Sequence, residues 1–92
     1  MKGLFRIRIF VSGNVQGVFF RVAAKEKAET LGVVGYVKNL SNGRVEILGE
    51  ASREKLLELA RWAGIGPRSA AVARCEKFWE AATGEFSKFE IT

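Results

Sequence analysis

GNVQGVFFR, residues 13–21, is the stretch around which the rest of this chain is organised. It lies between an alternating strand pattern and an alanine-rich helical pattern, so we expect a glycine-containing turn that ends at Arg21. Gly13 and Gly17 allow positive φ or a close approach to a ligand, and such a turn can point several N–H groups inward. The turn and the helix after it predict an anion-binding site.

The helix is predicted to begin at Phe20 or Arg21 and to end at Leu31, and it starts without a conventional cap. No Ser, Thr, Asp or Asn directly precedes it, which leaves its first amides free for another acceptor. Its first two turns carry Arg21, Lys25 and Lys27, although the helix dipole favours carboxylates there by roughly 0.3 to 1 kcal/mol per charge. A bound anion would reverse this penalty. The alternative is an ordinary loop whose lysines pair with nearby glutamates.

Hydrophobic periodicity places the other elements around this turn. We predict strands at residues 5–12, 33–40, 44–48 and 72–80, a helix capped by Ser52 that runs to about Ala63, and a final short strand within residues 86–91. Asn42-Gly43 makes a hairpin turn, and the imperfect alternation of the 72–80 strand indicates a bulge. The order βαββαβ with a short added strand predicts an α+β, ferredoxin-like sandwich, an antiparallel sheet with both helices on one face. A right-handed crossover puts the first strand in its centre.

Length and composition predict one domain, residues 1–92, in the cytoplasm. The net charge of +5 favours anionic partners without choosing among nucleotides, phosphorylated metabolites and nucleic acid. No stretch is long enough to span a bilayer, and arginines interrupt the N-terminal apolar run, so neither a membrane segment nor a signal peptide is expected. Cys75 is the only cysteine, which rules out an internal disulfide and leaves it as a small hydrophobic residue.

The chain contains no histidine and no aspartate. This removes Ser-His-Asp and Cys-His catalysis, aspartyl-phosphate chemistry and most metal sites. No arginine follows Cys75 in a phosphate loop, and no Gly-Lys-Ser/Thr loop is present. An enzyme with this composition has few groups to work with.

Two segments resemble the signatures of the acylphosphatase family. The first family signature is a hydrophobic residue, any residue, then G-x-V-Q-G-V-x-F-R, and residues 11–21 fit every specified position. The second is Gly, aromatic, small apolar, basic and Asn, then Gly and Val, which residues 35–39, Gly43 and Val45 match. The family pattern ends on a glycine where this chain has Ala51. The resemblance covers the whole chain.

This resemblance implies hydrolysis of acyl phosphates, with Arg21 binding the phosphate and Asn39 positioning the attacking water. Phosphate-binding groups are expected along the loop, at Asn14, Val15, Gln16, Gly17, Val18, Phe19, Phe20 and Arg21. An acyl phosphate releases a carboxylate, whose acid has a pKa near 4 or 5, so the reaction needs no proton donor. We expect no metal or cofactor, a monomer with acyl phosphate and inorganic phosphate as its small-molecule partners, and little discrimination among acyl groups.

Several alternatives stay open on the residues alone. Asn39 can simply shape a strand end, and Arg21 can form a surface salt bridge. The expected place of Phe19 and Phe20 is the core. A solvated sheet surface is the expected place of four basic residues, Arg6, Arg8, Arg44 and Lys88.

Two other functions compete with hydrolysis. Ferredoxin-like sheets also bind RNA, but the RNA-recognition signature needs its aromatic motif on a strand, whereas residues 15–22 form a turn leading into a helix. We therefore expect no nucleic-acid partner. The second alternative is a domain that binds an acyl or carbamoyl phosphate without catalysis.

Overall fold

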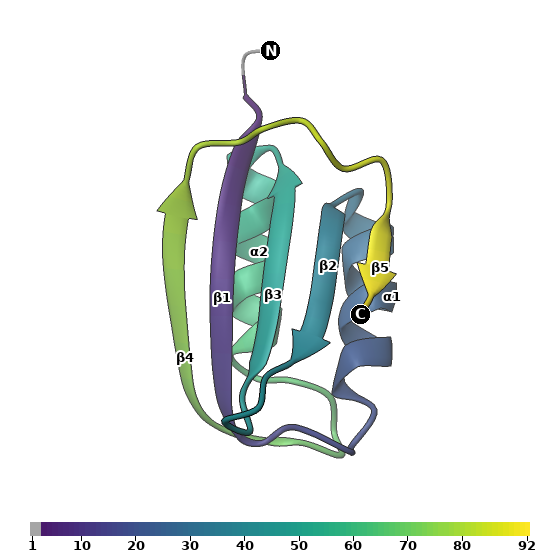
Figure 1. The fold of residues 1–92 in the computed structure, drawn as a ribbon, viewed down its shortest axis with the longest axis vertical. Coiled ribbons are helices and arrows are strands. Elements are labelled where there is room, and N and C mark those ends of the chain that lie inside the picture. The colour runs from purple at the N-terminus through teal and green to yellow at the C-terminus, as the bar shows by residue number, and fades with distance from the viewer. Residues whose placement is uncertain (1–2) are drawn as a thin grey trace.

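The computed structural model describes residues 3–92 and has the predicted element order (Figure 1). The elements are β1 (Phe5–Asn14), α1 (Phe20–Leu31), β2 (Val34–Asn39), β3 (Val45–Ala51), α2 (Arg53–Ala63), β4 (Ala71–Glu80) and β5 (Phe89–Ile91). The Ser52 side chain accepts a hydrogen bond from the Lys55 amide and caps α2 as expected. These elements confirm the ferredoxin-like α+β sandwich.

The strands form one sheet in the order β4-β1-β3-β2-β5. β1 pairs antiparallel with both β3 and β4, so the first strand is central, as the crossover rule predicted. β5 pairs parallel with β2, which makes the sheet mixed rather than wholly antiparallel. The reason is visible in Figure 1, where the chain after β4 crosses one end of the sheet and returns alongside β2 in the same direction.

Both helices cover the same face of the sheet, and the core lies between these two layers (Figure 1). The inward side chains of β1, Ile7, Ile9 and Val11, are completely buried, while Phe5 at its start is partly exposed. The helices bury small and aliphatic side chains against the sheet, namely Ala24, Ala28 and Leu31 on α1 and Leu56, Leu59, Ala60 and Ala63 on α2. Within residues 3–92, neither helix is long and apolar enough to cross a membrane.

The bulge predicted for β4 lies opposite the end of β1. Ser12 pairs with Arg74 and Gly13 with Val72, so Ala73 is the extra residue. Gly13 has φ of 123°, and a Cβ atom there would lie 2.3 Å from the Ala71 carbonyl oxygen. Gly13 therefore has the positive φ that the sequence allowed for, and its missing side chain makes room for β4 rather than for a ligand.

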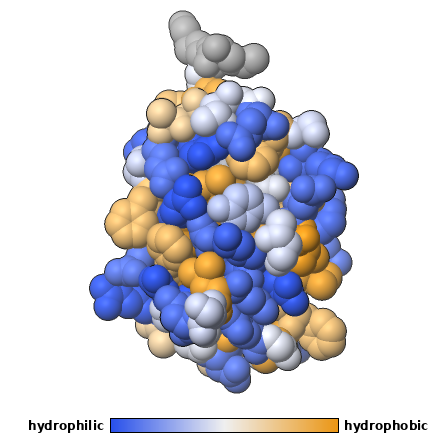
Figure 2. Space-filling model, in the orientation of Figure 1, coloured by the Kyte–Doolittle hydropathy of each residue, from blue (hydrophilic) through white to orange (hydrophobic). Residues whose placement is uncertain are grey.

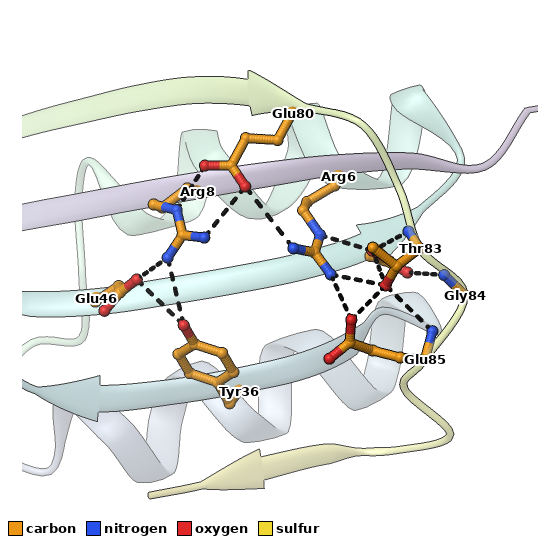
Figure 3. A network of polar contacts seen from close by, with 9 residues as sticks. Arg6, Arg8, Tyr36, Glu46, Glu80, Thr83, Gly84 and Glu85 are labelled. Atoms are coloured by element: carbon orange, nitrogen blue, oxygen red, sulfur yellow. Dashed lines mark hydrogen bonds and ion pairs between the residues drawn. The ribbon is translucent and has the colours of Figure 1, made fainter.

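The open face of the sheet is largely hydrophilic, as Figure 2 shows, but its arginines are less solvated than predicted. Arg6 donates to the buried Glu50 at 2.7 Å, and its side chain is only 12% exposed. Arg8 pairs with Glu80 at 2.6 Å and with the buried Glu46 (Figure 3). The prediction of a solvated surface was wrong for Arg6 and Arg8, because neighbouring strands place glutamates directly opposite Arg6 and diagonally to Arg8.

Glu50 ties the C-terminal segment to the sheet. Burial alone would raise its pKa, but hydrogen bonds from the Thr83 and Gly84 amides and from Arg6 outweigh burial and lower the pKa of this carboxyl. A charged Glu50 therefore anchors the crossing segment that leads to β5.

Candidate functional site

The turn between β1 and α1 has the backbone shape of an anion-binding loop. Gly17 has φ of 73°, and Phe19, the residue before α1, has φ of 62° with no side-chain cap. The amides of Phe20, Arg21 and Val22 donate no hydrogen bond within residues 3–92. The first amides are free, as the missing cap predicted, and three free donors at a helix N-terminus can attract an anion.

Two side chains hold this loop against neighbouring segments. The Gln16 Nε2 atom donates to the Leu40 carbonyl at 2.8 Å and to the Arg44 carbonyl at 2.9 Å, which ties the loop to the β2–β3 hairpin. The Ser69 hydroxyl donates to the Val18 carbonyl at 2.5 Å and ties it to the α2–β4 connection. The loop geometry is thus set by contacts distant in sequence.

Arg21 and Asn39 come from different elements and line the same cavity, which has a volume of about 230 Å³. Arg21 is in the first turn of α1, and Asn39 is the last residue of β2. Sheet pairing places the end of β2 beside the start of β3, to which Gln16 attaches the loop. The two residues implied by the family resemblance therefore lie together at one end of the sheet.

The Asn39 side chain carries an unused acceptor. Its Oδ1 atom is buried and is the only buried side-chain polar atom within residues 3–92 without a hydrogen-bond partner. Leaving such a group unpaired costs roughly 1 to 3 kcal/mol. Isolated buried acceptors in a cavity are characteristic of positions where a ligand or water supplies the donor.

Arg21 forms no ion pair with a glutamate in residues 3–92, so it does not behave as a surface salt bridge. Its Nη1 atom donates to the Thr92 carbonyl at 3.2 Å, and the Thr92 amide donates to Val37 of β2 at 2.9 Å. The C-terminal segment thus orients the guanidinium and leaves its charge available to an anion. Lys25 forms the surface pair with Glu29 that the sequence suggested.

The structure divides the predicted loop residues into two groups. Those that line the cavity are Val15, Gly17, Phe19, Phe20 and Arg21, together with Asn39. Three others lie outside its lining: Asn14 pairs with Ala71 in the sheet, Gln16 braces the hairpin, and Val18 packs against the core.

Phe19 and Val22 are the residues whose role the sequence did not reveal. Phe20 is buried as predicted, with its ring centroid 5.4 Å from that of Trp62, but Phe19 is 79% exposed. The prediction of a core position for Phe19 was wrong because its left-handed backbone turns the side chain away from the core. Val22, 48% exposed, also lines the cavity, and only its spacing of three residues from Phe19 could have signalled this.

Cys75 does not contribute a nucleophile. It packs against the core, and burial raises the pKa of its thiol, which keeps it protonated. Within residues 3–92 no three His, Cys, Asp or Glu residues are grouped to hold a metal ion.

Comparison with known proteins identifies the family of this chain. The Acylphosphatase family model matches residues 7–91. An acylphosphatase of Anaeromyxobacter sp. (strain Fw109-5) is 46% identical over 91 residues, 99% of this chain and 98% of the relative. The structure of an acylphosphatase from Coxiella burnetii has a TM-score of 0.92 at 38% identity and covers 99% of this chain and 95% of that one. The acylphosphatase from Bacillus subtilis has a TM-score of 0.91 at 31% identity, over 96% of this chain and 98% of that one. With a match across nearly its whole length, the chain belongs to the acylphosphatase family and is a hydrolase of that family.

Proposed function

We propose that residues 1–92 act as one domain that hydrolyses acyl phosphates to a carboxylate and inorganic phosphate by in-line attack of water, without a metal or cofactor. The observation that carries this proposal is the meeting of Arg21, the uncapped helix amides and the unpartnered Asn39 acceptor in one cavity. Phosphoryl transfer needs all three: Arg21 supplies positive charge, the amides orient the phosphoryl group, and Asn39 holds the nucleophilic water.

Arg21 and the loop amides bind the phosphoryl group. The guanidinium presents a planar fork to two phosphoryl oxygens, and the amides of the first helical turn donate to the same group. During the reaction the charge spreads over the equatorial oxygens, so fixed donors there stabilise the transition state. We expect the loss of Arg21 to weaken both binding and turnover.

Asn39 orients the water. Its Oδ1 accepts a hydrogen bond from the water, and its amide nitrogen donates to a phosphoryl oxygen, which fixes the line of attack. The water oxygen bonds to phosphorus while the bond from phosphorus to the acyl oxygen breaks, and the electron pair leaves on the carboxylate. The proton of the attacking water passes to the phosphate. No general acid is needed because the carboxylate is a weak base.

The test compares benzoyl phosphate with p-nitrophenyl phosphate in the presence of EDTA. We expect metal-independent hydrolysis of the acyl phosphate alone. Arg21→Ala should lower kcat/KM about 100-fold or more and weaken inhibition by inorganic phosphate. Asn39→Ala should lower kcat by about 100-fold with a smaller effect on phosphate inhibition.

Matched controls remove the same chemical groups elsewhere. Arg61→Ala removes an exposed arginine of α2, and Asn42→Ala removes an exposed asparagine of the hairpin turn, and both should keep near-natural activity. Equal losses of binding and turnover in Arg21→Ala and Asn39→Ala would contradict the division of roles. EDTA-sensitive hydrolysis would contradict the metal-free mechanism.

Action as a monomer and in the cytoplasm is also part of the proposal. The chain has a single cysteine and therefore no internal disulfide, which supports its location in a reducing compartment. Sedimentation equilibrium at micromolar concentration tests the monomer. RNA binding and non-catalytic binding of carbamoyl phosphate are favoured by neither the comparisons nor the geometry.

A further inference from the structure

Phe19 combines a strained backbone with a side chain that gains nothing from burial in the fold. Its φ of 62° is left-handed, which costs a non-glycine residue roughly 1 to 2 kcal/mol, and its aromatic side chain is 79% exposed. Glycine would adopt this backbone without strain. The ring belongs neither to the core nor to the aromatic pairs found within residues 3–92. Nothing in the fold itself accounts for a phenylalanine there.

The position of the Phe19 ring beside the cavity suggests why a phenylalanine occurs there. Phe19 and Val22 are three residues apart across the start of α1, and both line the cavity that contains Arg21 and Asn39. Val22 is 48% exposed although it is apolar. Deeper in the cavity the buried Val15 and Phe20 add further apolar surface. The site therefore has an apolar wall beside its anion-binding groups.

We propose that Phe19 and Val22 contact the acyl group of the substrate and give the enzyme a preference for apolar acyl groups, aromatic or branched aliphatic, over acetyl or carbamoyl. This inference rests on the function proposed above. With the phosphoryl group held at Arg21 and the helix amides, one bridging oxygen and the carbonyl carbon separate phosphorus from the acyl substituent. That short link keeps the substituent within reach of side chains beside the phosphate site. Contact with an apolar substituent removes apolar surface of both molecules from water.

This selectivity differs from the broad acceptance expected from the sequence. A phosphate-binding loop by itself does not distinguish acyl groups, because it contacts only the shared phosphoryl end. An apolar wall adds differential binding, and contacts of this kind give factors of roughly 10 to 200 between substrates that differ by small apolar groups.

The experiment measures kcat/KM for benzoyl phosphate and for acetyl phosphate in the natural chain, Phe19→Asn and Val22→Thr. Asparagine tolerates the left-handed backbone, and threonine keeps the shape of valine while making it polar. We expect the benzoyl-to-acetyl ratio to fall about tenfold in Phe19→Asn and severalfold in Val22→Thr, mainly through a higher KM for benzoyl phosphate. Thermal unfolding checks that both variants are folded.

Ile65→Thr is the matched control, because Ile65 is 72% exposed and apolar but lines a separate cavity with Lys27 and Trp62. Its benzoyl-to-acetyl ratio should equal that of the natural chain. Hydrolysis by Phe19→Asn and Val22→Thr with an unchanged ratio would overturn this inference and leave the proposed function standing. Failure of the natural chain to hydrolyse either substrate would overturn both.

Discussion

At the residue scale, the two glycines of the 13–21 turn have different physical roles. Gly13 is required by a close approach, since an added Cβ would lie 2.3 Å from the Ala71 oxygen and 2.6 Å from the Ala73 nitrogen. Gly17 is required only by its backbone angle, because a Cβ there would meet nothing within 4 Å. Gly13 is therefore needed for the packing of the sheet, and Gly17 for the conformation of the anion-binding loop.

Gly13→Ala is therefore expected to be the more damaging substitution. It combines left-handed strain with a clash against backbone atoms that cannot move independently of β4, and should lower the free energy of unfolding by roughly 2 to 5 kcal/mol. Gly17→Ala should cost about 1 to 2 kcal/mol. Urea unfolding curves of both variants measure the difference. Equal destabilisation would mean that the β4 contact is not what requires Gly13.

At the element scale, the site depends on a loop and a hairpin that are held together by one side chain. Gln16 bridges the Leu40 and Arg44 carbonyls across the hairpin turn, directly after Asn39. The position of Asn39 relative to Arg21 thus depends on a residue outside the cavity lining.

Gln16→Ala should reduce kcat about tenfold and leave inhibition by inorganic phosphate nearly unchanged, because the water is misplaced while the phosphate donors remain. Asn42→Ala provides the comparison, since it removes the 3.0 Å hydrogen bond from the Arg44 amide within the turn but leaves the loop tied. Steady-state kinetics of both variants are the measurement. If their activities were equal, Gln16 would have only a stabilising role.

At the scale of the whole molecule, Glu50 joins the middle of the sheet to the segment that connects its two edge strands, β4 and β5. It lies on β3, pairs with Arg6 of β1, and accepts hydrogen bonds from the Thr83 and Gly84 amides. The segment it anchors leads to β5, whose following residue, Thr92, contacts Arg21. An interaction at the end of the sheet opposite the cavity thus helps to place a residue of the site.

The pH dependence of the free energy of unfolding should reveal the contribution of Glu50. The pKa of Glu50 is lower in the folded chain than in the unfolded chain, so its stabilisation is complete above the unfolded value of about 4.3 and is lost as the pH falls through the folded value. The free energy of unfolding of Glu50→Gln should be roughly 1 to 3 kcal/mol lower at pH 7 than that of the natural chain. It should also change less as the pH falls into the acid range.

Urea unfolding between pH 7 and pH 3 tests this expectation. The curves of the natural chain and Glu50→Gln should converge towards low pH. Glu58→Gln is the control, since Glu58 is exposed on α2 and in no ion pair within residues 3–92. A constant difference between the natural chain and Glu50→Gln across this range would exclude Glu50 as the source of the dependence.

The fold was predictable where neighbours in sequence decide it. Alternation in β1, the Asn42-Gly43 turn and the Ser52 cap are local signals, and the structure confirms them. The parallel pairing of β5 was not predictable, because it depends on the path of a crossing segment that Glu50 holds. The pairing of Arg6 and Arg8 with glutamates depends likewise on strand register.

The order of elements, the uncapped start of α1 and the two signature residues, Arg21 and Asn39, could be read from the chain alone, since they follow from short patterns and from residue chemistry. The folded arrangement was needed to show that Arg21 and Asn39 line one cavity and that Phe19 faces solvent at its edge. Arg21 and Asn39, and the segments around them, are far apart along the chain. A cavity is formed by segments that meet only after the sheet has set its strand order, and no local pattern contains that information.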